Sequence, residues 1–280
     1  MLSTQDHNRF QEGYQYVYPV VSRRAGGVSL GINLNTNNAC NWRCIYCQVP
    51  DLVRGAPPAV DVDALQQELS VFLDQILSGS YLQDYVPEEQ RRLNDIAFSG
   101  NGEPTSAPNF VEAVDVVHNV RAQLGVPEAV KTVLITNGSL IHRKNVILGI
   151  EKLAGMNGEV WFKIDRATPD GIRSINDTRA NKSRMVSNLN AASRACPTWI
   201  QTCLFKVDGM NPSSAELDAY VDLIQELQTR DIPFKGVLLY GLARQSFQPE
   251  AARLAPVESA WFESFSGRLR ELGVTVKLSI

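Results

Sequence analysis

The sequence predicts an α/β protein whose parallel β-sheet forms an open or closed barrel. Three observations lead to this prediction. Strand-like and helix-like segments alternate along the chain, and repeated β/α alternation is typical of a parallel sheet. There are about six such units, which favours a barrel over a sandwich. The length of 280 residues, of which 44% are hydrophobic and 20% charged, fits one large domain.

Short β-branched or apolar runs predict strands at 27–34, 95–100, 129–138, 159–165, 199–207, 234–241 and 274–280. The clearest helix is expected over 60–79, where Asp61 or Asp63 can cap the start and Gly79 follows the end. Its apolar residues form one stripe: Leu65, Leu69, Phe72 and Ile76. A second helix is expected over 212–228, which opens with Pro-Ser-Ser and a glutamate placed for a capping box.

Charge and composition restrict the domain plan and the cellular location. We expect one domain over 27–280, preceded by an N-terminal extension over 1–26. The formal net charge of −3 excludes a general basic field of the kind that drives nucleic-acid binding, although it leaves room for local basic patches. The start lacks the layout of a signal peptide, and no apolar run is long enough to cross a bilayer. These features predict a cytoplasmic protein without a membrane partner.

Three of the five cysteines, Cys40, Cys44 and Cys47, lie within eight residues of each other. An odd number of crowded cysteines is unlike a disulfide framework and indicates thiolate ligands in a reducing compartment. Thiolates bind zinc, copper or iron–sulfur clusters. A zinc site normally has four ligands, so a three-thiol zinc site is the weaker alternative. A cubane cluster held by three cysteines keeps one iron open for another ligand.

The cysteines follow the first predicted strand, and unusual polar segments follow the second, third, fourth and sixth predicted strands. In chain order they are SGNGEPT (99–105), TNGS (136–139), KIDRATPD (163–170) and LYGLAR (239–244). Because the carboxyl ends of parallel strands meet at one rim of a barrel, we expect these segments and the cysteines to form one composite site.

The cysteine segment CNWRCIYC (40–47) has the C-x3-C-x-aromatic-C form, and with the other rim motifs the chain resembles the radical S-adenosylmethionine (radical SAM) superfamily. The resemblance implies a partial (β/α)6 TIM-like barrel. It implies a [4Fe–4S] cluster on Cys40, Cys44 and Cys47, whose open iron is chelated by the methionine part of SAM. A reducing electron donor, flavodoxin- or ferredoxin-like, then allows cleavage of SAM to methionine and a 5′-deoxyadenosyl radical, which abstracts hydrogen from a substrate.

The same resemblance assigns residues around SAM. Tyr46 matches the position near the adenine, and a core tyrosine is the alternative for it. Thr136 and Asn137 match polar residues near the SAM carboxylate, and a simple Asn-Gly turn explains the same letters. The segment that receives the SAM ammonium corresponds to Gly100, Asn101, Gly102 and Glu103.

Lys163 and Asp165 are charged residues in an otherwise apolar strand, and with a period of two they point to the same side. Charges that face a barrel interior are costly unless they are paired or bind a ligand. We therefore expect both at the rim as catalytic and SAM-binding residues, in contact with the SAM carboxylate or ribose. A structural Lys-Asp pair is the alternative.

Three other features have weaker implications. Cys196 and Cys203 are expected to be buried core residues, which predicts only one cluster. Arg244 follows the strand at 234–241 and is placed to receive an anionic substrate group at the barrel mouth. The segments at 22–27 and 54–55 are candidates to cover the site.

Within the superfamily, FSGNGEPT, LITNGSLI and VWFKID look most like an uncharacterised bacterial group related to the enzymes that form the wyosine base of tRNA. Archaeal-type wyosine enzymes carry extra N-terminal cysteines, and residues 1–39 contain none. Two alternatives remain open: a tRNA base-modifying enzyme, and a non-catalytic iron–sulfur or zinc-binding regulatory protein. We expect no salt-sensitive binding to bulk tRNA and a small-molecule, peptide or nucleotide-sized substrate that enters beside Arg244.

Overall fold

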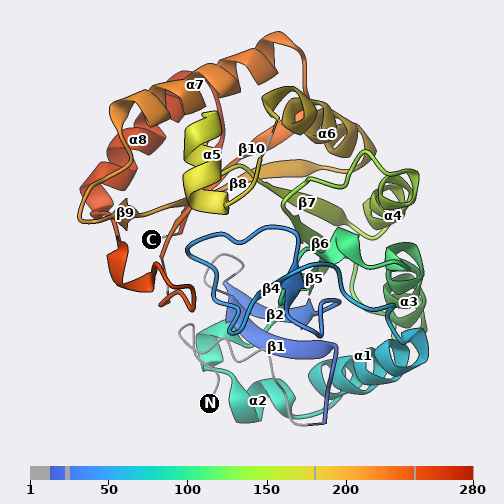
Figure 1. Cartoon of the computed structure of the whole chain (residues 1–280). Helices are drawn as coiled ribbons and strands as arrows, with labels where there is room; N and C mark the ends of the chain where they lie inside the picture. The colour runs from blue at the N-terminus through green and yellow to red at the C-terminus, as the bar shows by residue number, and fades with distance from the viewer. Residues whose placement is uncertain (1–12, 23–25, 180, 243, 280) are drawn as a thin grey trace.

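The computed structural model describes residues 13–22, 26–179, 181–242 and 244–279. Its centre is one eight-stranded sheet in the order β1-β2-β5-β6-β7-β8-β10-β12. β1 pairs antiparallel with β2, and the other neighbouring pairs of this sheet are parallel. The strands curl in an arc with the helices on the outside (Figure 1). The predicted partial (β/α) barrel is confirmed.

The strands of this sheet include a counterpart for each of the seven predicted runs. Their bounds are β1 (Val17–Ser22), β2 (Gly27–Ile32), β5 (Leu93–Phe98), β6 (Lys131–Thr136), β7 (Gly158–Lys163), β8 (Thr198–Leu204), β10 (Phe234–Gly241) and β12 (Val276–Ser279). Short strands outside it are β3 (Ala39–Cys40), β4 (Val53–Arg54), β9 (Lys206–Val207) and β11 (Leu254–Ala255). β3 pairs with β4 just before and after the cysteine segment.

β1 was not predicted, and it lies within the segment that the sequence sets apart as an N-terminal extension. Pro19 makes this run look unlike a strand, because proline has no N–H to donate to a ladder. β1 is an edge strand, where one side of the backbone has no ladder partner and proline is tolerated. The described part of the extension therefore adds an antiparallel edge to the barrel sheet.

Most helices connect the strands and pack against the outer face of the sheet, whereas α5 lies at the barrel mouth beside the cysteine segment (Figure 1). Their bounds are α1 (Val62–Leu77), α2 (Tyr81–Tyr85), α3 (Phe110–Gln123), α4 (Lys144–Ala154), α5 (Pro169–Asn176), α6 (Lys182–Ala195), α7 (Ser214–Thr229) and α8 (Ser259–Glu271). Single 3-10 turns are η1 (Glu88–Gln90), η2 (Pro104–Ser106) and η3 (Ala251–Arg253). Across the described ranges, no helix is long and apolar enough to cross a membrane.

The two predicted helices begin where their caps indicated. The Asp61 carboxylate accepts a hydrogen bond from the Ala64 N–H at 3.0 Å, which satisfies one of the free donors at the start of α1. Ser213 caps α7 in the same way, through the N–H of Glu216. The predicted apolar stripe of α1 is buried in the main core between helices and sheet: Leu65, Leu69, Phe72 and Ile76.

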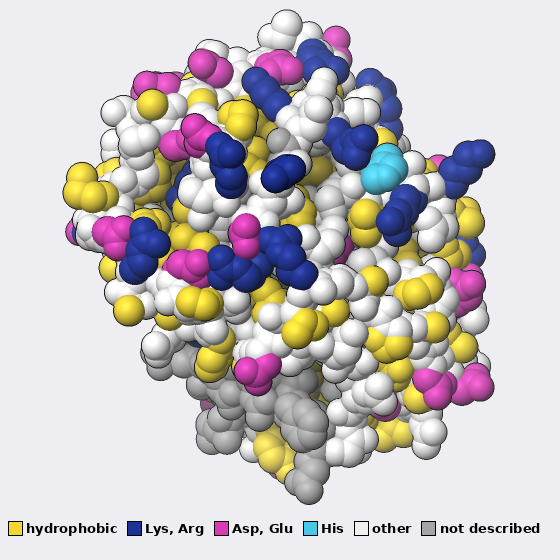
Figure 2. Space-filling view, viewed as in Figure 1, with side chains coloured by type: hydrophobic (Ala, Val, Ile, Leu, Met, Phe, Trp, Pro, Cys, Tyr) yellow, Lys and Arg dark blue, Asp and Glu magenta, His cyan; other side chains and the backbone are white. Residues whose placement is uncertain are grey.

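Basic side chains gather on the face that looks into the barrel mouth. Figure 2 shows Lys and Arg side chains over α5, α6 and the start of α4. The loop before α4 follows the carboxyl end of β6, and the loop between α5 and α6 lies beside the cysteine segment through Asp177. We call the following exposed residues the basic rim: Arg143, Lys144, Arg179, Lys182 and Arg184.

Candidate functional site

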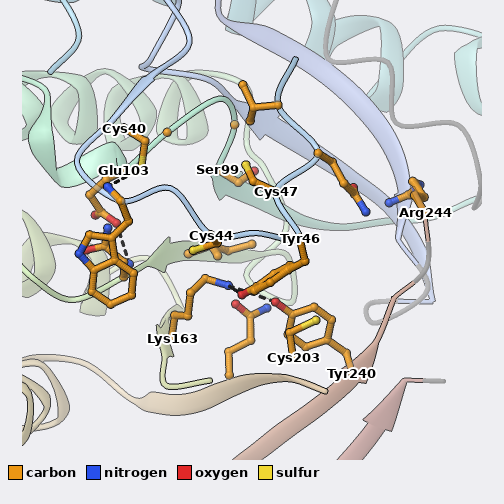
Figure 3. A pocket seen from close by; sticks show the side chains of 18 of the residues that line it. Cys40, Cys44, Tyr46, Cys47, Ser99, Glu103, Lys163, Cys203, Tyr240 and Arg244 are labelled. Atoms are coloured by element: carbon orange, nitrogen blue, oxygen red, sulfur yellow. Dashed lines mark hydrogen bonds between the residues drawn. The ribbon is translucent and has the colours of Figure 1, made fainter. Parts of the chain in front are cut away.

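One cavity opens at the carboxyl ends of the parallel strands, where the sequence places its unusual residues (Figure 3). Most of the predicted site residues line it: Cys40, Cys44, Tyr46, Cys47, Gly100, Gly102, Glu103, Thr136, Asn137, Lys163 and Arg244. Asn101 and Asp165 do not line it but contact residues close to it. Segments far apart in the sequence therefore form one composite site, as expected for the rim of a barrel.

The thiols of Cys40, Cys44 and Cys47 line the same hollow (Figure 3). Within the part of the chain that the structure describes, no three His, Cys, Asp or Glu side chains are close enough together to hold one metal ion. A cubane cluster bonds each cysteine to a different iron, so its ligands stand farther apart than the ligands of one ion. The three thiols thus face one cavity, as the ligands of one cluster would.

Two of these sulfurs accept hydrogen bonds. The Trp42 N–H donates to Cys40 Sγ at 3.5 Å, and the Asn176 amide donates to Cys44 Sγ at 3.3 Å. Burial raises the pKa of the Cys40 thiol to about 12 and also raises the pKa of Cys44 well above its usual range. Both thiols therefore hold their protons at neutral pH until a metal displaces them.

Arg43, between the first two cysteines, ties the cysteine segment to two distant parts of the chain. Its Nε donates to Asp177 at 2.8 Å, and its two terminal nitrogens donate to the two oxygens of Glu250 at 2.9 and 2.8 Å. Bidentate guanidinium–carboxylate pairs fix orientation as well as distance. Arg54 also forms an ion pair with Asp177 at 2.8 Å, so the segment is held on both sides.

Hydrogen bonds to the backbone of the cysteine segment complete this attachment. The Ser246 hydroxyl donates to the carbonyl of Ile45 at 2.8 Å, and the Gln248 amide donates to the carbonyl of Val49 at 3.0 Å. The Ile45 N–H donates to the carbonyl of Ile175 at 2.9 Å. These bonds fasten the backbone around the cysteines to α5 on one side and to the loop after β10 on the other.

Gly100 and Gly102 let the loop after β5 pass close to the segment before the cysteines. A Cβ at position 100 would lie 2.8 Å from the Cα of Asn33, and Gly100 has a φ of +142°. A Cβ at position 102 would lie 2.1 Å from the carbonyl oxygen of Ala39. Between them, the Asn101 N–H donates to the Asn33 side chain at 2.9 Å. Any larger residue at either glycine would push the two loops apart.

The Glu103 carboxylate is buried and joins the loops that follow β5 and β6. Its Oε1 accepts from the hydroxyls of Thr105 and Thr136, both at 2.6 Å, and from the Thr105 N–H at 3.2 Å. Its Oε2 accepts from the Asn137 N–H at 2.6 Å. Burial raises the pKa of Glu103, and these hydrogen bonds act in the opposite direction. Two oxygens offer about four acceptor sites, so the protein itself uses much of their capacity.

Asn137 extends this contact to the cysteine segment. Its amide nitrogen donates to the side-chain oxygen of Asn41 at 2.8 Å, and the amide nitrogen of Asn41 donates to the Ser139 hydroxyl at 2.8 Å. Gly138 has a φ of +72°, so the Asn-Gly turn considered for these letters is also present. Thr136 and Asn137 thus lie at the cavity and connect the loop after β6 with the residue that follows Cys40.

Lys163 and Asp165 point to the same side, as their spacing predicts, and Tyr46 lies between them. The Tyr46 hydroxyl donates to Asp165 at 2.5 Å and accepts from the Lys163 ammonium at 2.7 Å. The ammonium also donates to the Tyr240 hydroxyl at 3.1 Å (Figure 3). Asp165 accepts a second bond from Asn176 at 2.7 Å, and Asn176 is also the residue that donates to Cys44. The cysteine segment and the charged end of β7 are therefore parts of one network.

Ionisation of this network follows from its burial and its charges. Burial acts to lower the pKa of Lys163, but the nearby Asp165 carboxylate outweighs it, so the pKa lies above its usual range. Burial raises the pKa of the Tyr46 phenol, and the Asp165 charge raises it further. At neutral pH the cavity therefore contains an ammonium group beside a neutral phenol.

The two remaining cysteines are buried, as predicted for core residues. Burial raises the pKa of both Cys196 and Cys203 to about 12. Cys196 packs in the main core. Cys203 packs against Phe205 and Tyr46 and also reaches the wall of the cavity.

Sequence reasoning missed several residues that build the site. Arg43 sits between two cysteines, a position that could have marked it as an anchor, but its partners are remote in sequence. Tyr240 is the next-to-last residue of β10, Asn176 is the last residue of α5, and both look like ordinary residues near the end of an element in the sequence. Gln201 is a polar residue within a buried strand, and that placement was a usable indication.

Comparison with known proteins identifies the family. The family model described as the radical SAM superfamily matches residues 34–217, well over half of the chain. A UPF0026 protein of Synechocystis is 26% identical over 57% of this chain and 52% of its own length. A UPF0026 protein of Methanocaldococcus jannaschii is also 26% identical, over 54% of this chain and 44% of its own length. The chain spans about half or less of the length of these curated relatives.

Solved structures share the fold. The structure described as TYW1 with a lysine-pyruvate adduct bound has a TM-score of 0.57 and 17% identity, covering 89% of this chain and 74% of that chain. A radical SAM methyltransferase from Sphaerobacter thermophilus has a TM-score of 0.58 and 14% identity, covering 90% of this chain and 66% of that chain. At these identities the likeness is one of fold.

Proposed function

Because this chain belongs to the radical SAM superfamily, whose enzymes use a [4Fe–4S] cluster and SAM, we propose that Cys40, Cys44 and Cys47 bind the cluster and that the protein cleaves SAM reductively. The observation that carries the proposal is the convergence of the three thiols and the SAM-side loops on one cavity. When bound, the cluster supplies the electron that converts SAM to methionine and a 5′-deoxyadenosyl radical, which modifies a substrate still to be identified. A reductant is required, and we propose a flavodoxin- or ferredoxin-like donor.

The loops after β5 and β6 are proposed to bind the methionine part of SAM. Gly100, Gly102 and Glu103 offer backbone and carboxylate oxygens to its ammonium, and Asn101 holds this loop against the cysteine segment. Thr136 and Asn137 lie next to Glu103 and offer polar groups to its carboxylate. This arrangement is supported by the close approach of the two loops to Cys40, which brings SAM within reach of the cluster.

Lys163, Asp165 and Tyr46 are proposed to orient SAM. They would place a cation next to its carboxylate or ribose and an aromatic ring next to its adenine. The ammonium of Lys163 is a buried cation at the cavity wall and suits the SAM carboxylate or a ribose oxygen. Asp165 keeps Lys163 charged through the Tyr46 hydroxyl. The Tyr46 ring, fixed at both sides of its hydroxyl, offers a flat apolar face to the adenine.

The proposal is tested by anaerobic reconstitution with iron and sulfide, followed by incubation with SAM and dithionite. We expect a brown protein with about four irons per chain that releases 5′-deoxyadenosine. Replacing Cys40, Cys44 and Cys47 by alanine should abolish both the colour and the product, because each residue supplies one protein bond to the cluster. The matched control is Cys196→Ala, which removes a buried thiol from the core.

Two results would contradict the proposal. One is a colourless protein that retains tightly bound zinc, which would support the regulatory zinc-binding alternative. The other is a full cluster signal in the triple alanine variant, which would move the cluster ligands elsewhere in the chain.

A second candidate function, tRNA base modification, is favoured by the basic rim around the barrel mouth (Figure 2). The residues of the rim come from two segments, 143–144 and 179–184, which come together in the folded chain. Clustered cations are the usual means by which a protein neutralises RNA phosphates. The resemblance of VWFKID and neighbouring motifs to the group related to wyosine-forming enzymes points to the same class of substrate.

A further inference from the structure

Gln201 is a buried amide that the proposed SAM chemistry does not use. It lies in the middle of β8, where it pairs in register with Lys163 of β7 and Leu238 of β10. Its side chain is 1% exposed and lines the cavity. Among the residues that the structure describes, neither its Oε1 nor its Nε2 has a hydrogen-bond partner.

An amide in this state destabilises the fold, because burial removes its bonds to water and nothing replaces them. Nearly all buried polar side chains have a partner, and the exceptions call for an explanation. A methionine or leucine at this position would fill the same space without that cost. The amide therefore indicates a ligand that completes its hydrogen bonds when the cavity is filled.

The position of Gln201 separates it from the residues proposed for the methionine part of SAM. Glu103, Thr136 and Asn137 lie at or beyond the ends of their strands. Gln201 is level with Lys163 in the register of the sheet, but β7 lies between its strand and β6, so Gln201 is separated from these residues across the sheet. The ammonium of Lys163 and the thiol of Cys203 line the same part of the site.

We propose that Gln201 recognises the substrate through a ligand edge that carries a hydrogen-bond acceptor and a donor side by side. Such an edge occurs in nucleobases and in primary carboxamides, and glutamine pairs with base edges in this way. A trans peptide bond points its N–H and C=O in opposite directions, so one glutamine cannot bind both. This inference rests on the proposed function and narrows its substrate class.

Charge in the cavity favours a nucleotide as the source of this edge. Arg244 lines the same cavity as Gln201 and, unlike Lys163, is a cation that the proposal does not assign to SAM. Arg244 follows β10 and lies on the side of the cavity away from Glu103 (Figure 3), so we expect a phosphate attached to a base at Gln201 to meet its guanidinium. Asp165 stays engaged with Tyr46 and Asn176, so its charge does not face the ligand.

The experiment measures binding of four probes to the reconstituted protein with SAM present and no reductant, by anaerobic calorimetry. The probes are UMP, GMP, nicotinamide and N-acetylalanine N′-methylamide, a blocked alanine amide whose amide bonds are all secondary and trans. We expect at least one nucleotide to bind, and Gln201→Met to weaken that binding by at least tenfold, because methionine keeps the volume and removes both hydrogen bonds. Binding of nicotinamide alone would assign the edge to a carboxamide instead of a base.

The unfolding temperature of the ligand-free protein gives a second test, because replacing a residue with a structural role would lower it. Gln201→Met should keep or raise the unfolding temperature, because it removes an unsatisfied amide. The matched control is Thr132→Val. The Thr132 hydroxyl is also buried and without a partner among the described residues, but it does not line the cavity. This variant should likewise keep its unfolding temperature while it binds every probe like the wild type.

Four outcomes would overturn the inference, and the first three concern binding. They are equal binding of the probes to Gln201→Met and wild type, binding of the blocked alanine amide as tightly as a nucleotide, and a loss of SAM affinity in Gln201→Met that assigns the residue to the adenine of SAM. A wild-type protein that releases 5′-deoxyadenosine but binds no probe would refute this inference and leave the proposed function standing. A wild-type protein without a cluster would refute the proposed function itself.

Discussion

Glu103 shows how one buried residue organises the SAM side of the cavity. Its carboxylate accepts hydrogen bonds from η2 and from the loop after β6, so it holds together two loops that the sequence separates by more than thirty residues. The sequence suggested only a contact with the SAM ammonium. The structure adds that the same carboxylate orders Thr136 and Asn137 before SAM is present.

The variant Glu103→Ala is expected to weaken SAM binding by about ten- to a hundredfold, the equivalent of a charge-assisted hydrogen bond of roughly 1.5–3 kcal/mol. It should also lower the free energy of unfolding by about 2–4 kcal/mol, because it leaves the donors of Thr105, Thr136 and Asn137 without an acceptor. Cluster content should stay near that of the wild type. Calorimetry with SAM and urea unfolding measure the two effects.

Thr136→Val is the matched control, since it removes one donor to Glu103 and keeps the carboxylate. It should have a smaller effect on both quantities. Unchanged SAM affinity in a folded Glu103→Ala protein would restrict Glu103 to the structural role.

β7 carries at one end the charge that we propose to bind SAM, and at the other end a charge that forms ion pairs between strands. Its carboxyl end presents Lys163 to the cavity, and its second residue, Glu159, forms ion pairs with Lys131 of β6 at 2.7 Å and Lys235 of β10 at 3.4 Å. Glu159 also accepts from the Trp161 indole at 3.2 Å. These contacts hold neighbouring strands together at the end of the barrel opposite the site.

The ion pairs of Glu159 predict a pH-dependent contribution to stability. Burial acts to raise its pKa, but the hydrogen bond from Lys131 and the nearby charges outweigh it and lower the pKa below its usual value. A carboxylate with a lowered pKa stabilises the fold above its unfolded pKa of about 4.3, and the contribution is lost as the pH falls through the folded value. Glu159→Gln should therefore unfold at a lower temperature than the wild type at pH 7.

The difference between the two proteins should shrink as the pH falls below about 4, where the wild-type carboxyl takes up its proton. Thermal unfolding followed by circular dichroism over a pH series measures it. A difference that stays constant from pH 7 to pH 3 would attribute the effect to packing and not to charge.

The choice between tRNA and a smaller substrate depends on the charge distribution of the whole molecule, because the basic rim forms only in the folded chain. The formal net charge of −3 predicts no salt-sensitive binding to bulk tRNA at micromolar protein, and we keep this as the expected outcome. Binding that appears at low salt and weakens steeply toward physiological salt would support the RNA candidate instead. Filter binding over a salt series makes the measurement.

A triple variant locates any such binding. Replacing Arg143, Arg179 and Arg184 by alanine should reduce the salt slope by about two to three, since each phosphate contact contributes roughly 0.7–0.9 to it. A matched triple variant removes three exposed cations near the opposite end of the barrel, at the ends of α7 and α8 and the start of β12: Arg230, Arg270 and Lys277. Equal loss in both variants would show a non-specific attraction and not an RNA site at the mouth.

The sequence by itself determined seven strands of the sheet, two of the helices and the edge of the sheet at which the candidate site lies. These features are local: apolar periodicity sets strands and helices, caps set where helices begin, and parallel strands must turn the same ends to one rim. The spacing of Cys40, Cys44 and Cys47 indicated thiolate ligands, and the resemblance to the radical SAM superfamily favoured a cluster over zinc. β1 was not predicted, because Pro19 makes the local sequence unlike a strand. The proline is tolerated because β1 lies at the edge of the sheet.

Only the tertiary structure decided which remote residues hold the site together and what lies inside the cavity. Arg43 meets Glu250 across 207 positions of sequence, and Ser246 meets Ile45 across 201. Such pairs depend on how the sheet curls and where each loop returns, which no local pattern encodes. The same holds for Gln201, because an amide in a strand is unremarkable until packing around it shows that its hydrogen bonds are missing.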